Sequence, residues 1–372
     1  MKYYIIAGET SGDLHGANLI RSLKLRDQEA EFRIVGGDQM QSASGQHALI
    51  HTSEMAFMGL IEVIKNLRSV SKNLKKVKRD LAEANPDALI LIDFPGFNLR
   101  IADFAKKIGL RVFYYISPKI WAWNQKRVYK IKQRVDHMFC ILPFEVDFYK
   151  SFHYPVDYVG NPLLDAISAY TFEPDFRKKN KLTDLPIIAL LPGSRKMEIE
   201  HLLPEMVDLY FKFPGHQLVI AGAPNFDISL YQRYIGDLPI QIVFDQTYDL
   251  LKNADAAVVT SGTATLETAL LNVPQVVVYK ANPITVAVAR QVIRVSFISL
   301  VNLINNYLSV IELIQKECTT DAIAEELNRL INDPTHRASV LENYALLQEK
   351  MGKPGASGRT AELIVGYLSE SV

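Results

Sequence analysis

Short hydrophobic runs, each followed by a turn and then by a helical period, recur along the chain. In the first half they occupy residues 3–7, 88–92 and 112–116. Strands that are hydrophobic at every position are typical of parallel sheets covered by helices on both faces, whereas a half-solvated strand alternates with polar residues. The pattern therefore predicts an α/β fold with buried parallel strands and crossover helices.

The same pattern restarts after a polar, charged interval at about residues 171–184. The hydrophobic runs that follow lie at residues 187–191, 217–221, 240–244, 256–260 and 275–279. The interval predicts a linker between two doubly wound parallel-sheet domains, the first over residues 1–170 and the second over residues 185–345. Residues 346–372 read as a C-terminal helical segment.

Composition fits a folded two-domain protein without a strongly charged surface. A chain of 372 residues exceeds the ~250–300 that one hydrophobic core usually supports. Because 41 Lys and Arg balance 41 Asp and Glu, we expect no general attraction to nucleic acid. Two cysteines, Cys140 and Cys318, are too few for a disulfide scaffold or a cysteine metal cluster. No hydrophobic run approaches the ~18 residues that a membrane-spanning helix needs.

A loop of Gly193, Ser194 and Arg195 separates one of these runs from a predicted helix. Backbone N–H groups at a helix N-terminus attract anions, and an arginine can clamp a diphosphate through two hydrogen bonds. An ordinary strand-to-helix turn with a solvated arginine explains the same residues equally well. The spacing matches neither the P-loop nor the dinucleotide-binding motif.

A second loop of small residues follows the run at 256–260 and leads to Glu267. Its members are Ser261, Gly262, Thr263, Ala264 and Thr265. Small hydroxyl residues let a phosphate approach closely, and a carboxylate one turn into the helix can accept hydrogen bonds from ribose hydroxyls. Simple N-capping with a favourable helix dipole is the competing explanation. Together, the two loops predict a nucleotide-diphosphate site in the second domain.

No metal centre or other cofactor is expected. The chain contains no Asp-x-Asp pair, no His-Glu-x-x-His motif and no clustered His and Cys residues. A departing diphosphate would then be stabilised by Arg195, by backbone N–H groups and by a helix end.

Two carboxylates follow hydrophobic runs in the first domain: Glu9 after residues 3–7, and Asp93 after residues 88–92. Open parallel sheets bind ligands at the carboxyl ends of their strands, so both side chains are expected to face one crevice. Burial beside Phe94 would raise the pKa of Asp93 toward the range of a general base. Capping of a helix or loop by Asp93 is the alternative.

Two segments of the first domain mix hydrophobic residues with cations. Their members are Met58, Leu60, Ile61, Lys72 and Lys76 in the first segment, and Trp121, Trp123 and Arg127 in the second. Such segments suit an anionic membrane surface or a phosphorylated lipid. A buried hydrophobic face with solvated lysines explains them too.

Several ordered motifs connect these features, at residues 7–13, 58–63, 92–98, 117–127, 142–145, 190–195, 261–267 and 299–303. In sequence and order they resemble the lipid-A-disaccharide synthases, a family of glycosyltransferases, over nearly the full length. The resemblance implies a GT-B architecture, in which two Rossmann-like domains face each other across a cleft. The chain departs from the family pattern at Gly96, Asn161 and Val301.

The resemblance also implies an activity. The family joins UDP-2,3-diacylglucosamine to 2,3-diacylglucosamine 1-phosphate (lipid X), with inversion, to give lipid A disaccharide 1-phosphate and UDP. It places the essential aspartate at Asp93, its neighbouring glutamate at Glu9, and UDP-sugar contacts at Arg195 and Asn302. It further implies a peripheral protein on the cytoplasmic face of the Gram-negative inner membrane, and a homodimer formed by exchange of C-terminal segments.

Two alternatives stay open at this point. One is an enzyme like UDP-N-acetylglucosamine 2-epimerase, whose soluble substrates need no membrane-facing segment. The other is a non-catalytic nucleotide-sugar binding protein.

Overall fold

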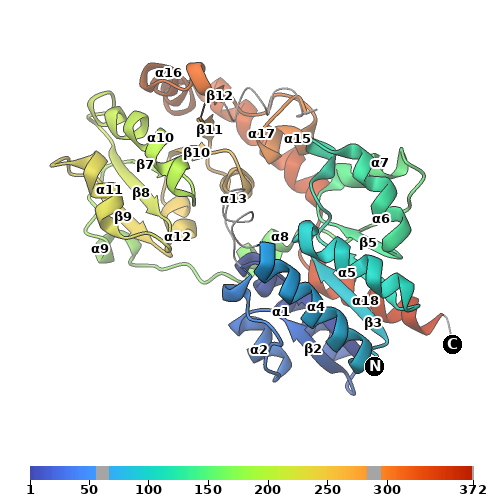
Figure 1. Cartoon of the computed structure of the whole chain (residues 1–372). Helices are drawn as coiled ribbons and strands as arrows, with labels where there is room; N and C mark the ends of the chain where they lie inside the picture. Colours follow the sequence, from blue (N-terminus) through green and yellow to red (C-terminus); the bar gives the residue numbers. More distant parts are fainter. Residues whose placement is uncertain (56–66, 283–294, 371–372) are drawn as a thin grey trace. The chain divides into compact units, whose positions relative to one another are not determined.

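The computed structural model describes residues 1–55, 67–282 and 295–370. The chain forms two compact units, the first made of Met1–Asp165 together with Lys353–Val372, and the second of Ala166–Gly352. It therefore passes from one unit to the other twice, and the C-terminal residues return to the first unit (Figure 1).

The first unit contains a parallel six-stranded sheet with the order β2-β1-β3-β4-β5-β6. Its strands are β1 (Lys2–Ala7), β2 (Glu31–Val35), β3 (Ala88–Ile92), β4 (Arg111–Tyr115), β5 (His137–Cys140) and β6 (Asp157–Tyr158). The strand order reverses between β1 and β3, because β2 lies on one side of β1 and β3 on the other.

Helices cover both faces of this sheet. They are α1 (Thr10–Arg26), α2 (Asp38–Ser44), α4 (Leu67–Ala84), α5 (Pro95–Lys107), α6 (Val128–Arg134), α7 (Pro143–Lys150) and α18 (Ala356–Ser369), with short 3₁₀ turns at η1 (Thr52–Glu54), η2 (Ile120–Ala122) and η3 (Gln125–Arg127). Within β1, Tyr4 and Ile6 join the core under α4 to α7, and Tyr3 and Ile5 join the core under α1 and α18. Burial on both sides explains why the strand is hydrophobic at every position.

The second unit contains another parallel six-stranded sheet, with the order β12-β11-β10-β7-β8-β9. This is the strand order of the Rossmann fold. Its strands are β7 (Ile187–Leu191), β8 (Gln217–Gly222), β9 (Gln241–Phe244), β10 (Ala256–Thr260), β11 (Gln275–Tyr279) and β12 (Glu312–Ile314). Here the order reverses between β7 and β10. The predicted fold class, two doubly wound parallel sheets in succession, is confirmed.

Most helices of the second unit lie between these strands along the chain. They are α9 (Phe176–Lys179), α10 (Lys196–Val207), α11 (Ile228–Ile235), α12 (Thr247–Lys252), α13 (Thr263–Leu270), α15 (Leu300–Asn305), α16 (Thr320–Asn332) and α17 (Pro334–Met351), with 3₁₀ turns at η4 (Asp208–Phe211) and η5 (Gln315–Glu317). Helix α8 (Pro162–Ala169) contains the point where the chain first leaves the first unit.

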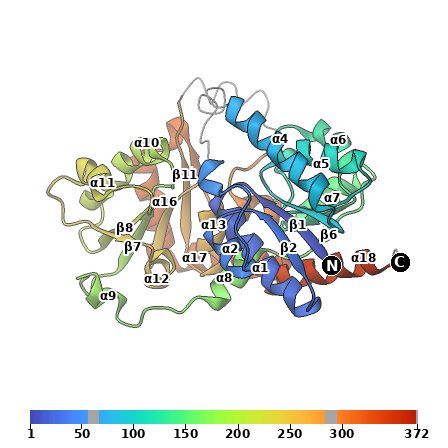
Figure 2. The ribbon, with the colours of Figure 1, turned by 60° about the horizontal axis from the view of Figure 1, so that its bottom comes forward.

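The last helix, α18, packs against α1 in the first unit (Figures 1 and 2). Its first turn is held by Asp165, whose carboxylate accepts hydrogen bonds from the backbone N–H groups of Gly355 and Ala356. Arg359 adds a bond of 2.8 Å from Nε to the carbonyl oxygen of Val159. An acidic group at a helix N-terminus satisfies N–H groups that lack partners within the helix, so these bonds fix where α18 begins.

Candidate active site

In each unit a group of the predicted site residues directly follows the two strands between which the strand order reverses. In the first unit, Ala7 of β1 and Ile92 of β3 are paired neighbours, so Glu9 and Asp93 leave the sheet side by side. In the second unit, β7 and β10 are paired, and the loops at 193–195 and 261–265 follow them. Open α/β sheets bind ligands at such positions. The structure therefore brings the predicted residues together in two groups, one in each unit.

The Asp93 carboxyl is partly buried and lies within electrostatic range of other charges. Burial raises its pKa, the negative charge of Glu9 raises that pKa further, and the positive charge of Lys119 lowers it. A raised pKa makes a carboxylate a better proton acceptor near neutral pH. The N-cap position of α5 is Phe94, not Asp93. The Asp93 carboxylate is thus not the cap of this helix.

The backbone at this position is strained. Asp93 and Phe94 have φ angles of 43° and 49°, in the left-handed region that residues with a side chain rarely adopt. Each such residue costs about 1–3 kcal/mol and persists only where its surroundings hold it. The position of the Phe94 ring requires a glycine at residue 8, because a Cβ there would lie 2.2 Å from that ring.

The backbone N–H groups of the Gly193 loop bind a side chain from α10, the helix that follows the loop. Gly193 has a φ of 110°, and a Cβ there would lie 2.4 Å from Glu198 Oε2. The same oxygen accepts hydrogen bonds of 3.2 Å from the backbone N–H groups of Ser194 and Arg195. The Arg195 side chain is 76% exposed and lies 3.5 Å from the Glu198 carboxylate. The backbone N–H groups of Ser194 and Arg195, which were expected to bind an anion, therefore already have an acceptor. The Arg195 guanidinium, in contrast, faces solvent.

The Ser261 loop is exposed where the following helix begins. Gly262 and Thr263 are exposed at the beginning of α13, and no atom lies within 4 Å of the place where a Cβ of Gly262 would be. Ser261 Oγ donates to the carbonyl oxygen of Ile298 at 2.8 Å, and Thr265 Oγ1 donates to that of Gly262 at 2.8 Å. Ser261 and Thr265 thus shape the loop, and the first residues of α13 form its accessible surface, which includes the partly exposed Ala264.

Glu267 and Asn302 differ in how accessible they are. Glu267 is partly buried, burial raises its pKa, and Tyr248 donates a hydrogen bond of 2.9 Å to it. Asn302 is completely buried. Its amide donates to Val310 and Glu312 and accepts from Ser309 and Val310 at 2.7–2.9 Å. The family resemblance implied a UDP-sugar contact at Asn302, but its side chain has no bonding capacity left and instead fixes the loop after α15.

The tryptophan loop divides into a buried and an exposed part. Trp121 is only 6% exposed, packs edge-on against Phe144 and donates from Nε1 to the buried Glu145 at 3.1 Å. Trp123 is 47% exposed, and the Arg127 guanidinium lies 5.2 Å from the centre of its ring. Of the two predicted lipid contacts, Trp121 is therefore a core residue, because its ring and its N–H group both have partners within the fold.

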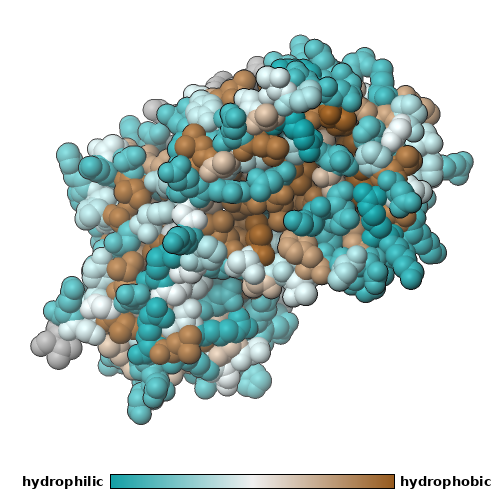
Figure 3. Space-filling model, turned by 180° about the vertical axis from the view of Figure 1, so that it is seen from behind, coloured by the Kyte–Doolittle hydropathy of each residue, from teal (hydrophilic) through white to brown (hydrophobic). Residues whose placement is uncertain are grey.

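Helix α4 buries its hydrophobic face and exposes its cations. Val77 and Leu81 are fully buried against the sheet. Lys72 and Lys76 are exposed, and Lys76 Nζ donates to the carbonyl oxygen of Leu49 at 2.8 Å. The predicted membrane residues Met58, Leu60 and Ile61 lie outside the described residues. On the face shown in Figure 3, hydrophobic residues form patches among hydrophilic ones.

Among the residues that the structure describes, no helix is long and hydrophobic enough to cross a membrane. Nor do three or more His, Cys, Asp or Glu side chains of this part of the chain come together as metal ligands.

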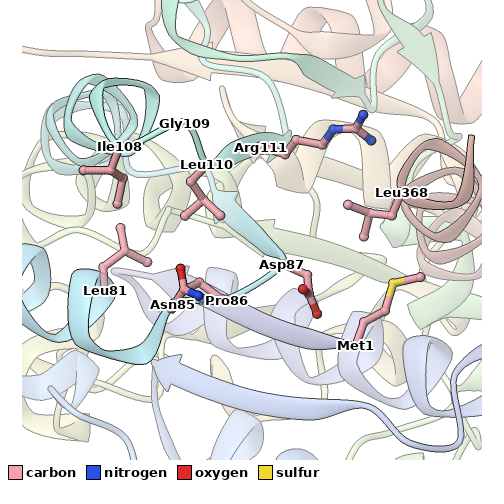
Figure 4. Close-up of a pocket in the computed structure, with 10 residues that line it drawn as sticks. All are labelled: Met1, Leu81, Asn85, Pro86, Asp87, Ile108, Gly109, Leu110, Arg111 and Leu368. Carbon is pink, nitrogen blue, oxygen red and sulfur yellow. The ribbon is translucent and has the colours of Figure 1, made fainter. Parts of the chain in front are cut away.

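A pocket of about 510 Å³ lies at the opposite end of the first sheet (Figure 4). Its lining includes Met1, Asp87, Arg111 and Leu368, at the amino ends of β1, β3 and β4 and at the end of α18. The site residues follow the carboxyl ends of the strands, so this pocket is separate from them.

The fold, and the position of these loops within it, place the chain in the GT-B class. The S. aureus MnaA–UDP co-structure matches with a TM-score of 0.70 at 14% identity, over 99% of this chain and 97% of that one. The glycosyltransferase of kitacinnamycin matches with a TM-score of 0.66 at 15% identity, over 99% of each chain. A putative UDP-N-acetylglucosamine 2-epimerase from Listeria monocytogenes matches with a TM-score of 0.67 at 13% identity, over 99% and 97%. At these identities the likeness shows the fold alone.

Sequence similarity gives the family. A family model described as lipid-A-disaccharide synthetase matches residues 3–358. The lipid-A-disaccharide synthase of Trichlorobacter lovleyi is 40% identical over 99% of this chain and 97% of its own length, and that of Myxococcus xanthus is 40% identical over 98% and 97%. The chain therefore belongs to the lipid-A-disaccharide synthase family, which makes it a glycosyltransferase of lipid A biosynthesis. The resemblance inferred from the motifs is confirmed.

Some residues around Asp93 and Glu267 were not predicted as site residues. They are Asn98, Tyr114, Lys119 and Tyr248. Asn98 had a signal in the sequence, since it is a polar residue at a position that the hydrophobic periodicity assigns to a buried helix face. The others contact the site only because the fold brings distant strands and helices together.

Proposed function

We propose that the protein joins UDP-2,3-diacylglucosamine to 2,3-diacylglucosamine 1-phosphate, with inversion at the anomeric carbon. Family membership supports this reaction. The observation that carries the proposal is the Asp93 carboxyl, which follows β3 at the reversal of the strand order, beside Glu9, with a raised pKa.

In the proposed reaction, Asp93 accepts the proton of the acceptor's 6-hydroxyl. The acceptor oxygen forms a bond to the anomeric carbon while the bond from this carbon to the diphosphate breaks, and UDP departs with the electron pair. Glu9 does not react in this scheme. Its negative charge raises the proton affinity of Asp93.

On the donor side, we place the diphosphate at the exposed beginning of α13 and the Arg195 guanidinium. The N-terminus of α13 offers N–H groups and a positive dipole end to an anion. Arg195 is free to reach a phosphate because most of its side chain is exposed. Glu267, which already accepts a bond from Tyr248, is assigned to the ribose hydroxyls.

The acyl chains of both substrates support a peripheral position on the cytoplasmic face of the inner membrane, with α4, the exposed Trp123 and the adjacent Arg127 toward anionic lipid. Replacing Lys72 and Lys75 by glutamine is expected to weaken binding to anionic vesicles by about 2 kcal/mol, about 1 kcal/mol for each cation. The control removes two exposed lysines of the second unit, Lys178 and Lys181. Equal binding of both variants and the wild type in a vesicle sedimentation assay at low salt would show that the α4 lysines are only solvated.

A homodimer formed by exchange of the C-terminal segment stays a prediction. The carboxylate of Asp165 would hold the α18 of a second copy through the same bonds that it makes to Gly355 and Ala356 of its own chain.

Product analysis tests the proposed function. The purified protein is mixed with UDP-2,3-diacylglucosamine, with lipid X, and with both, and the products are identified by mass spectrometry. The expected result is UDP and a disaccharide phosphate only when both lipids are present. Conversion of the donor alone would support the epimerase alternative, and UDP binding without any product would support the non-catalytic one.

A further inference from the structure

The strained turn after β3 is held through a main-chain carbonyl. Asp93 and Phe94 both have positive φ angles, and neither is a glycine. Such residues stay in this region only when their surroundings leave no alternative. The carbonyl oxygen of Asp93 receives two hydrogen bonds, one from Asn98 Nδ2 at 2.8 Å and one from the hydroxyl of Tyr114.

These two donors belong to different elements of the first unit. Tyr114 lies in β4, where it pairs in parallel register with Leu91 of β3. Asn98 lies in the first turns of α5, and its Nδ2 also donates to the carbonyl oxygen of Ile92 at 3.1 Å. Both side chains are fully buried. Burial raises the pKa of Tyr114 well above its ordinary value, so the hydroxyl keeps its proton and remains a donor.

We propose that Tyr114 and Asn98 are positioning residues for the Asp93 carboxylate, which they orient by fixing the main-chain carbonyl of the same residue. The peptide plane that follows Asp93 cannot rotate while a strand and a helix both donate to its oxygen. The direction in which the Asp93 side chain leaves the backbone is thereby fixed before any substrate binds. This inference rests on the proposed role of Asp93 as the base.

The proposal differs from a purely structural role in what it predicts for catalysis. A small misplacement of a reacting group lowers the rate without weakening the binding of substrates held by other residues. A structural bond, in contrast, contributes to the stability of the whole unit, and its loss does not single out one step of the reaction.

The first experiment replaces Tyr114 by phenylalanine, which removes only the donor. We expect kcat to fall about tenfold, which is less than the ~10²- to 10⁴-fold that a positioned base contributes as a whole, with KM for both substrates within about twofold of wild type. The control is Tyr154→Phe, which removes a buried hydroxyl that donates to the carbonyl oxygen of Val135 at 3.0 Å. Both variants lose the same kind of bond, so their shifts in Tm should be similar, but only Tyr114→Phe should lower kcat.

The second experiment combines Tyr114→Phe with Asp93→Asn. If Tyr114 acts through Asp93, its substitution changes kcat by less than about twofold once the base is absent, because residues that act as a unit are not additive. Asn98→Ala is measured in the same two backgrounds and should behave in the same way. Since Tyr114→Phe removes one oxygen atom only, it keeps the test decisive if Asn98→Ala folds poorly.

Each outcome decides between the two proposals. A tenfold loss that is equal in both backgrounds, or a normal kcat for Tyr114→Phe beside an inactive Asp93→Asn, would overturn the positioning role and leave the proposed function intact. Normal turnover by Asp93→Asn would instead overturn the role of the base on which the inference rests.

Discussion

Replacing Asp93 by asparagine is expected to lower kcat by about 10²- to 10⁴-fold while the protein stays folded and binds UDP. An amide has the shape of a carboxylate but cannot take the proton of the acceptor hydroxyl. The substitution also removes a partly buried charge close to Glu9, so it relieves repulsion and should not destabilise the first unit. Release of UDP gives kcat, calorimetry gives the affinity for UDP, and the thermal transition reports folding.

Two companion variants sharpen this result. Asp38→Asn makes the same chemical change on a carboxylate that is 90% exposed, and it should turn over like the wild type. Arg195→Ala removes the proposed diphosphate clamp, so it should chiefly raise KM for the UDP-sugar. Turnover close to wild type by Asp93→Asn would exclude this carboxylate as the base.

The strands that were predicted with their ends are among those buried on both faces. β3, β7, β10 and β11 begin and end at the predicted residues, because unbroken hydrophobic runs bounded by turns occur there. The shortest strands at the sheet edges were not predicted. β6 has two residues and β12 has three, and all of them are only partly buried. Such segments become strands through pairing with a neighbour, which their own hydrophobic pattern does not encode.

The position of the site was also predictable, since it depends on where strands end. Asp93 and Glu9 were expected to face one crevice because each follows a buried strand, and β1 and β3 are indeed paired neighbours. Which donors hold the backbone of Asp93 was not predictable. Tyr114 lies on another strand, and its hydrogen bond exists only once β3 and β4 are in register.

Hydrogen-bond partners within the fold also explain why some groups that were expected to contact a ligand are already bonded inside the protein. A polar residue in a loop looks available for a ligand until its hydrogen bonds are known. Asn302 has all of its bonds inside the protein, and the N–H groups of Ser194 and Arg195 bind Glu198. Residue type and spacing located both loops, but the division between groups that shape the loop and groups that face a ligand required the structure.

Glu145 is expected to make the stability of the first unit depend on pH. It is buried next to Trp121, without a salt bridge among the described residues, and burial raises its pKa from about 4.5 to about 7. A carboxyl with a raised pKa contributes stability that is fully present below its unfolded pKa and is lost as the pH rises through its folded pKa. The loss amounts to about 3 kcal/mol between about pH 4.5 and pH 8.

A variant is needed to isolate this effect, because the contribution of His15 to stability changes with pH in the opposite direction. Burial lowers the pKa of His15 to about 4, so its contribution is lost as the pH falls. Comparison with Glu145→Gln cancels the histidine. The wild-type free energy of unfolding minus that of the variant should fall by about 3 kcal/mol as the pH rises over the same range. The chain has only two tryptophans, Trp121 and Trp123, so their fluorescence during urea unfolding reports this unit alone.

The control is Glu29→Gln, which removes an exposed carboxylate of the same unit and should give a difference that does not vary with pH. A flat difference for Glu145→Gln as well would mean that Glu145 keeps the same charge in the folded and unfolded states.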